Sequence, residues 1–271
     1  MDLKDRTVLV TGSTDGVGRV VAQRLGTSTA HVLVHGRDRQ RGENVVSAIA
    51  DDGGRADLIV ADLSRLAEVR RLADTVRATT DRLDVLINNA GIGTAGAERQ
   101  ESADGYELRF AVNYLAGFLL TSLLLPLLKA SAPARIVNVA SAGQQAIDFD
   151  DVMLTRRYDG ARAYCQSKLA QIMFTVDLAS ELEGTDVTVN SLHPATYMNT
   201  TMVRQAGVTP RSSVEQGAEA ILNLATSPAL EGRSGLYFDG LREARADPQV
   251  YDAKARQKLL ALSLELTGLA T

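Results

Sequence analysis

The sequence has few of the residues that carry disulfides, zinc sites or nucleic-acid binding. Its 271 residues include one cysteine and three histidines. One cysteine excludes an internal disulfide, and three scattered histidines argue against a zinc site. The net charge of −4 shows no basic excess, which argues against nucleic acid as the main partner. We therefore expect no metal and no nucleic-acid partner.

The chain also lacks a long uninterrupted apolar run. The longest stretch, Phe118 to Leu128, contains Pro126 and is shorter than the roughly 20 residues that span a bilayer. The first six residues, from Met1 to Arg6, contain no apolar core of a signal peptide. These absences predict a cytoplasmic protein without membrane association. No repeat or linker marks a boundary, so we expect one domain over residues 1–271.

Short apolar runs alternate with helical patterns along the chain. Strands are predicted at residues 7–10, 32–34, 58–61, 83–87, 135–139 and 187–192, and a long helix at about 105–128. This alternation predicts an α/β Rossmann fold, a doubly wound parallel sheet with helices on both faces. Ligands of such sheets bind beyond the carboxyl ends of the strands. Polar or special residues fall just after predicted strands, namely Gly12, Asp62, Asn88, Asn89, Ser141 and Pro194.

A glycine-rich turn follows the first predicted strand. Thr11-Gly12-x-x-x-Gly16-x-Gly18 runs directly into a helical pattern that contains Val20, Val21 and Leu25. A strand, a glycine turn and a helix allow backbone N–H groups and a helix N-terminus to approach a pyrophosphate. The alternative is a tight turn that needs glycine only for its backbone angles. The flanking strand and helix favour the nucleotide.

A tyrosine and a lysine lie four residues apart at the start of another helical pattern. On a helix, Tyr164 and Lys168 would lie on one face. An ammonium about 5 Å from the phenol would favour the phenolate by roughly 3 kcal/mol, or about two pK units. Such a tyrosine could act as a general acid or base near neutral pH. The alternative is a Tyr–Lys pair that only packs.

These motifs together resemble those of the short-chain dehydrogenase/reductase family. The resemblance covers about Leu3 to Phe238, and it includes the glycine turn, Asp62-Leu63, Asn88-Asn89-Ala90-Gly91 and His193-Pro194. It implies a catalytic set of Asn113, Ser141, Tyr164 and Lys168. In that family's chemistry Tyr164 would exchange a proton with the substrate oxygen and Ser141 would hydrogen-bond the same oxygen. Lys168 would bind the nicotinamide ribose and lower the tyrosine pKa, and the Asn113 carbonyl would hold a water.

The resemblance also implies a set of cofactor contacts. In addition to Tyr164 and Lys168, these are Gly12, Ser13, Thr14, Asp15, Gly16, Val17, Gly18, Arg37, Asp62, Leu63, Asn89, Ala90, Gly91, Pro194 and Thr196. Structural alternatives exist for several of these residues. Ser141 could cap a turn or helix, and Asp62 could cap a helix that begins near Ser64.

The residue after the second strand decides between the two nicotinamide cofactors in this fold. Gly36 stands where an acidic residue would bind the adenine ribose of NAD, and Arg37 follows. A guanidinium suits a 2′-phosphate by geometry and charge, so we expect NADP(H) in preference to NAD(H). Two acids oppose this expectation: Asp38 could turn back toward the ribose, and Asp15 lies in the glycine turn.

The part of the chain expected to bind substrate differs in length from that of most single-domain members of the family. The 22 residues between Ser141 and Tyr164, residues 142–163, form a segment similar in length to that of retinol-dehydrogenase-like members. We expect this segment and residues 195–212 to form substrate loops, and residues 239–271 to close the fold. Met153, Ala161, Tyr197 and Met202 suggest an apolar pocket.

The sequence therefore predicts an NADP(H)-dependent oxidoreductase. It would transfer hydride between nicotinamide and a carbonyl or alcohol of a small to medium apolar substrate. Two alternatives are a non-catalytic NADP-binding regulatory protein, and an epimerase or dehydratase on the same scaffold. By resemblance we also expect a homodimer or homotetramer.

Overall fold

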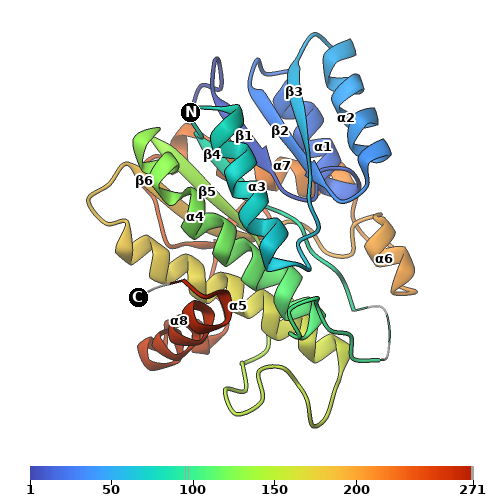
Figure 1. The fold of residues 1–271 in the computed structure, drawn as a ribbon, viewed down its shortest axis with the longest axis vertical. Coiled ribbons are helices and arrows are strands. Elements are labelled where there is room, and N and C mark those ends of the chain that lie inside the picture. Colours follow the sequence, from blue (N-terminus) through green and yellow to red (C-terminus); the bar gives the residue numbers. More distant parts are fainter. Residues whose placement is uncertain (95, 97, 270–271) are drawn as a thin grey trace.

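The computed structural model describes residues 1–94, 96 and 98–269, and its centre is a single eight-stranded sheet (Figure 1). The strand order is β3-β2-β1-β4-β5-β6-β7-β8, and every neighbouring pair is parallel except β7 and β8. This order confirms the predicted doubly wound α/β fold. The strands are β1 (Thr7–Val10), β2 (His31–Gly36), β3 (Arg55–Val60), β4 (Val85–Asn88), β5 (Ala134–Val139), β6 (Val187–His193), β7 (Tyr237–Asp239) and β8 (Arg242–Ala244).

Helices cover both faces of the sheet (Figure 1). One face packs against α1 (Gly16–Gly26), α2 (Arg39–Asp51) and α7 (Val214–Thr226). The other packs against α3 (Leu66–Thr79), α4 (Ala116–Ala130), α5 (Gly160–Glu181) and α8 (Ala253–Thr267). Strands β1, β2, β4 and β5 are buried on both faces, which explains why they read as continuous apolar runs rather than alternating ones.

The chain reverses its direction of travel across the sheet between β1 and β4. From β1 it proceeds to β2 and β3 on one side, and from β4 it proceeds to β5 and beyond on the other. Loops on either side of such a switch point border a crevice at the carboxyl edge of the sheet. The glycine turn after β1 and the Asn89–Gly91 loop after β4 lie at this edge.

The predicted helix at 105–128 differs from the observed one. The described chain forms a π-helix, η1 (Phe110–Leu115), which continues into α4. Pro126 lies inside α4 without ending it, because leucines on both sides of it, Leu124 and Leu128, are buried in the core. The continuous helix Phe110–Ala130 has 21 residues and is long and apolar enough to cross a membrane, by length and composition. The expectation that no segment has that length is therefore wrong.

The C-terminal part contains a hairpin that the sequence patterns did not reveal. β7 and β8 pair antiparallel, and Leu241 lies in the turn between them. The short helices η2 (Pro228–Leu230) and η3 (Pro248–Tyr251) precede α8, which Asp252 caps. Helix α8 is tied to η1, since the hydroxyls of Tyr114 and Ser263 lie 2.7 Å apart. Residues 270–271 of the predicted closing segment lie outside the described residues.

Candidate active site

The glycine turn and the loop after β4 touch each other. Gly12 has φ +63°, and a Cβ there would lie 2.8 Å from the Ala90 Cα. A Cβ on Gly18 would lie 2.3 Å from the Gly12 carbonyl oxygen. The amide of Asn89 donates to the carbonyls of Thr11 and Gly12, at 2.9 and 3.0 Å. Glycine is therefore required for the close packing of these two loops, and Asn89 locks them together.

A histidine that the sequence analysis did not single out supports the same turn. The Gly12 N–H donates to Nδ1 of His35 at 3.2 Å, and Nε2 of His35 lies 3.2 Å from the Ala61 carbonyl oxygen. Because Nδ1 accepts, these partners assign the proton to Nε2. Burial lowers the pKa of His35 to about 4, so the ring is neutral at physiological pH.

The start of α1 and the end of β2 meet at the predicted adenine-ribose position. Asp15 caps α1 by accepting from the Gly16 N–H at 2.7 Å. A Cβ on Gly36 would lie 2.4 Å from Thr14 Cγ2, so Thr14 excludes an acidic side chain at position 36. Arg37 is exposed, and its side chain has no hydrogen bond or ion pair within the described part of the chain.

The carboxylate of Asp38 contacts Arg41 and is therefore not free. It caps α2 by accepting from the Arg41 N–H at 3.0 Å, and it lies 3.5 Å from Nε of Arg41. Arg41 also lies 3.7 Å from the carboxylate of Asp15. Both acids that opposed the NADP(H) expectation are therefore partly compensated by one arginine.

The remaining predicted contacts lie in the glycine turn, at the start of α1 and just after β3 and β6. Ser13 is buried and donates to the Val10 carbonyl at 2.8 Å, and Val17 packs in the α1 core. Asp62 accepts from the Ser64 N–H at 3.0 Å and does not cap α3, whose first residue, Leu66, bonds Asp104 instead. Leu63 and Pro194 are buried, whereas Thr196 is exposed and its hydroxyl lies 3.1 Å from Nε2 of His193.

Three of the predicted catalytic side chains converge between β5 and α5. Ser141 follows β5 closely, and its Oγ accepts from the Gly143 N–H at 3.0 Å. A Cβ on Gly143 would lie 3.4 Å from Ser141 Oγ and 3.7 Å from Tyr164 Cε1, so both side chains face the same space. The Lys168 Nζ lies 5.9 Å from the centre of the Tyr164 ring. It donates to the Val139 carbonyl and to Oε1 of Gln171, both at 2.9 Å. Burial lowers the pKa of Lys168 to about 7.

The Tyr164 phenol is perturbed in the direction opposite to the one expected from its spacing to lysine. Burial raises the pKa of Tyr164, and the hydrogen bond to Ser141 offsets part of this increase. The ammonium group of Lys168 is directed at the Val139 carbonyl and Gln171 rather than at the phenol oxygen. The protein groups around Tyr164 therefore favour its neutral, proton-donating form.

Asn113 lies in the π-helix η1, one turn before α4. Its Oδ1 accepts from the Ile92 N–H at 2.8 Å, and its Nδ2 donates to the Ile92 carbonyl at 3.1 Å and to Ser167 Oγ at 3.0 Å. A Cβ on Gly91 would lie 3.2 Å from Asn113 Oδ1 and 3.3 Å from Lys168 Nζ. Asn113 thus holds the 91–92 loop beside Lys168, and a π-helix at such a point is typical of functional sites.

Comparisons with known proteins agree with this geometry. The short chain dehydrogenase family model matches residues 6–210. The chain belongs to this family. It is 39% identical to retinol dehydrogenase 14 of Homo sapiens, over 97% of this chain and 87% of that one. It is 37% identical to retinol dehydrogenase 13 of Mus musculus, over 98% of this chain and 84% of that one.

Two solved structures are similar to this chain over most of its length. An uncharacterised protein of Mycobacterium paratuberculosis has a TM-score of 0.78 at 30% identity and covers 98% of this chain and 96% of its own. The RhlG/NADP complex of Pseudomonas aeruginosa has a TM-score of 0.72 at 30% identity, over 88% and 95%. The predicted retinol-dehydrogenase-like branch is confirmed, and the chain is an oxidoreductase that acts on CH–OH groups with a nicotinamide cofactor and small-molecule substrates.

The expectation of a cytoplasmic short-chain dehydrogenase is wrong. The relatives at 35–39% identity are retinol dehydrogenases, and the helix Phe110–Ala130 has the length and composition of a membrane span. That expectation depended on Pro126 ending the apolar run, and it does not. The same finding removes the basis for predicting no membrane association.

Besides His35, sequence patterns missed Gln171, a buried polar residue of this dehydrogenase site. Gln171 lies one helical turn after Lys168 and is buried, and a small cavity is lined by Gln171, Asn113 and Asn88 among others. Asn88 Oδ1 has no hydrogen-bond partner among the described residues. The i, i+3 spacing of Lys168 and Gln171 on a helix was the available signal. In the described ranges no group of three or more His, Cys, Asp or Glu could hold a metal ion.

Proposed function

We propose that the protein is an NADP(H)-dependent oxidoreductase that transfers hydride between nicotinamide and a carbonyl or alcohol of a small to medium apolar substrate. The observation that supports this most strongly is that Ser141 and Tyr164 face the same space beside Gly143, with the buried Lys168 amine 5.9 Å from the centre of the Tyr164 ring. All three lie at the carboxyl edge of the sheet, on the same side as the glycine turn. This arrangement presents two hydroxyls to one substrate oxygen.

The residues at the switch point fit a dinucleotide. The close packing of Gly12 and Gly18 against Ala90 and Asn89 brings the two loops of the switch point together, and the N-terminus of α1 lies at the same edge, as a pyrophosphate site requires. In this proposal Gly12 to Gly18 hold the pyrophosphate, Asp62 and Leu63 the adenine, and Asn89 to Gly91 with Pro194 and Thr196 the nicotinamide half. The bound cofactor supplies or accepts the hydride.

Preference for the phosphorylated cofactor depends on Arg37. Its guanidinium is exposed next to Gly36, where Thr14 leaves no space for an acidic side chain. Arg37 can therefore bind a 2′-phosphate at a position where an acid would have bound the ribose hydroxyls. The relative solved as an NADP complex supports the same preference.

Each catalytic side chain then has one task. The neutral Tyr164 phenol donates its proton to the substrate oxygen in the reductive direction, and Ser141 holds that oxygen by a second hydrogen bond. Lys168, fixed by the Val139 carbonyl and Gln171, binds the ribose. Asn113 keeps the 91–92 loop in contact with this amine. In the oxidative direction Tyr164 must lose its proton, which its raised pKa opposes.

The substrate side is apolar in this proposal. Segments 142–163 and 195–212 border it, and residues 239–271 close the fold behind it. Met202 on α6 (Thr201–Gln205) lies against Gly93, since a Cβ on Gly93 would lie 2.6 Å from Met202 Cγ. Met153 packs partly buried against the core. Thioether side chains give an adaptable apolar surface, which suits an apolar carbonyl or alcohol.

A homodimer or homotetramer is part of the same proposal. The half-buried leucines of α4, Leu123, Leu125 and Leu127, leave apolar surface that a second copy would cover. Light scattering coupled to size exclusion measures the mass directly, and a monomer at micromolar concentration would contradict this point.

The function is tested with a panel of aldehydes, ketones and alcohols with NADPH or NADP⁺, read by nicotinamide absorbance. We expect turnover of apolar members, and Tyr164→Phe should lower kcat by about a hundredfold or more, because it removes the proton donor. Substantial turnover by Tyr164→Phe would contradict the mechanism. Nucleotide binding without turnover of any member would favour the non-catalytic regulatory alternative.

A further inference from the structure

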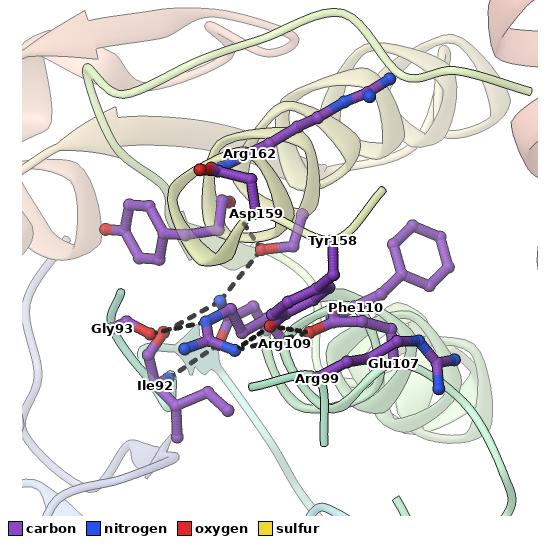
Figure 2. A network of polar contacts seen from close by, with 12 residues as sticks. Ile92, Gly93, Arg99, Glu107, Arg109, Phe110, Tyr158, Asp159 and Arg162 are labelled. Atoms are coloured by element: carbon purple, nitrogen blue, oxygen red, sulfur yellow. Dashed lines mark hydrogen bonds and ion pairs between the residues drawn. The ribbon is translucent and has the colours of Figure 1, made fainter. Parts of the chain in front are cut away.

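Two charged side chains outside the proposed catalytic set are fully buried. The side chains of Glu107 and Arg109 are 0% and 4% exposed, and their charged groups lie 3.6 Å apart. Burial of a charge is costly unless the group is paired and its hydrogen-bonding capacity is used. Here both conditions are met. Glu107 Oε2 accepts from the Phe110 N–H at 2.7 Å, and Arg109 Nε donates to the Gly93 carbonyl at 2.8 Å (Figure 2).

Tyr158 links these two charges to the 142–163 segment. Its hydroxyl accepts from Nη1 of Arg109 and donates to Oε1 of Glu107 at 3.1 Å (Figure 2). Burial, followed by the charge of Glu107, raises the pKa of Tyr158 to about 12. The phenol therefore stays neutral and can both donate and accept. A phenylalanine at this position could do neither.

The same network holds the loop that lies beside Lys168. Asn113 binds both backbone groups of Ile92, and Arg109, four residues earlier on the same helical stretch, binds the carbonyl of Gly93. Met202 on α6 also lies next to Gly93. Residues 92–93 are thus contacted by Asn113 and Arg109 from one helical stretch and by Met202 from α6. They follow Gly91, where a Cβ would lie 3.3 Å from Lys168 Nζ.

Tyr158 is also the last anchor of the 142–163 segment before α5. The middle of that segment is held by hydrogen bonds to the Val152 carbonyl from Gln166 and to the Met153 carbonyl from Arg99. Thr155, Arg156 and Arg157 are exposed, and the chain returns to the body of the protein at Tyr158. Helix α5, which carries Tyr164, begins two residues later at Gly160.

We propose that Tyr158, Glu107 and Arg109 are positioning residues that fasten the 142–163 segment to the 92–93 loop, so that this segment forms a fixed wall of the substrate pocket rather than a free flap. The proposal rests on the proposed function, because it assigns substrate selection to the same site. Its consequence is a dependence on substrate size. A substrate large enough to reach the wall gains from its fixed position, and a small one does not.

Tyr158→Phe tests the proposal with little change in volume. It removes two hydrogen bonds, both to charged partners, and we expect KM for a bulky apolar substrate to rise about tenfold. The kcat, the KM of a small aldehyde and the Kd of NADPH should each stay within about twofold. Trypsin cleavage after Arg156 or Arg157, which reports release of the segment, should become about tenfold faster.

Tyr106→Phe is the matched control, since the Tyr106 hydroxyl donates one hydrogen bond, to the Leu266 carbonyl at 2.9 Å, outside the network. It should leave both the KM ratio of large to small substrates and the cleavage rate within about twofold. The double variant Glu107→Gln/Arg109→Gln preserves net charge. It should reproduce the effect of Tyr158→Phe, and combining all three changes should add little, because the residues act as a unit.

A KM for the bulky substrate that stays at its wild-type value in Tyr158→Phe, with cleavage no faster than in Tyr106→Phe, would overturn the positioning role. An equal rise in KM for both substrates would also contradict it, since that is the result of a general structural defect. If the wild-type protein turns over no substrate, the proposed function fails. The comparison of cleavage rates still decides whether the network fastens the segment.

Discussion

Protonation of His35 should destabilise the protein in mild acid. In the fold its Nδ1 accepts from Gly12, and burial holds its pKa at about 4, against a value near 6.5 in an unfolded chain. Between these values the unfolded chain binds more protons than the folded one, so stability is lost as the pH falls from about 6.5 to about 4. The full shift corresponds to about 3 kcal/mol, and about 2 kcal/mol of it is lost between pH 7 and pH 5.

The assay is urea unfolding of wild type and His35→Gln at pH 7 and pH 5. The amide does not titrate, and the carboxylates of the two proteins contribute alike, so the difference between the proteins isolates His35. Asp62 is the charged group that acts on this ring, and it opposes the shift only partly. We expect wild type to lose about 2 kcal/mol more than the variant over this interval. A difference between the proteins that does not change with pH would refute the assigned neutral ring and its bond to the glycine turn.

Two further predictions concern the cofactor and the lysine. Arg37→Ala should weaken NADPH binding by about tenfold to a hundredfold and leave NADH unchanged, measured by fluorescence titration, whereas Arg39→Ala, whose exposed side chain faces Glu43 at 3.7 Å, should change neither. Unchanged NADPH affinity in Arg37→Ala would contradict the preference for NADP(H). Gln171→Leu keeps the side-chain size but removes an acceptor from Lys168, so kcat should fall about tenfold with substrate KM within about twofold. Wild-type kcat in this variant would exclude a positioning role for Gln171.

The sheet and the edge that carries the site could be predicted because they follow from local patterns. The six longer strands contain short apolar runs, and the alternation with helices predicts that these strands are parallel. β7 and β8 have three residues each, too few for a period to be recognised. The persistence of α4 through Pro126 could not be predicted either, because it depends on the burial of Leu124 and Leu128 against distant elements.

The site residues also divide into those that local sequence patterns predict and those that such patterns do not reveal. Gly12, Ser141, Tyr164 and Lys168 could be found because their spacing along the chain is itself the motif. His35 and the Glu107–Arg109–Tyr158 network could not, since each acts through a partner from another element. Gln171 had a signal in its i, i+3 spacing to Lys168 on α5. Glu107 and Tyr158, for example, are 51 positions apart and share one hydrogen bond. No periodicity in the sequence records such a pair.

The pKa of Tyr164 shows why local geometry alone could not decide the chemistry. A lysine four residues away on a helix predicts a phenol pKa lowered by about two units, because Coulomb attraction favours the phenolate. In the fold, burial acts on both groups at once: it raises the pKa of the phenol and lowers that of the amine to about 7. An amine with that pKa is only about half charged at neutral pH, and its hydrogen bonds are directed at Val139 and Gln171. The attraction therefore loses to desolvation, and the pair favours the form of Tyr164 that donates a proton, as reduction of a carbonyl requires.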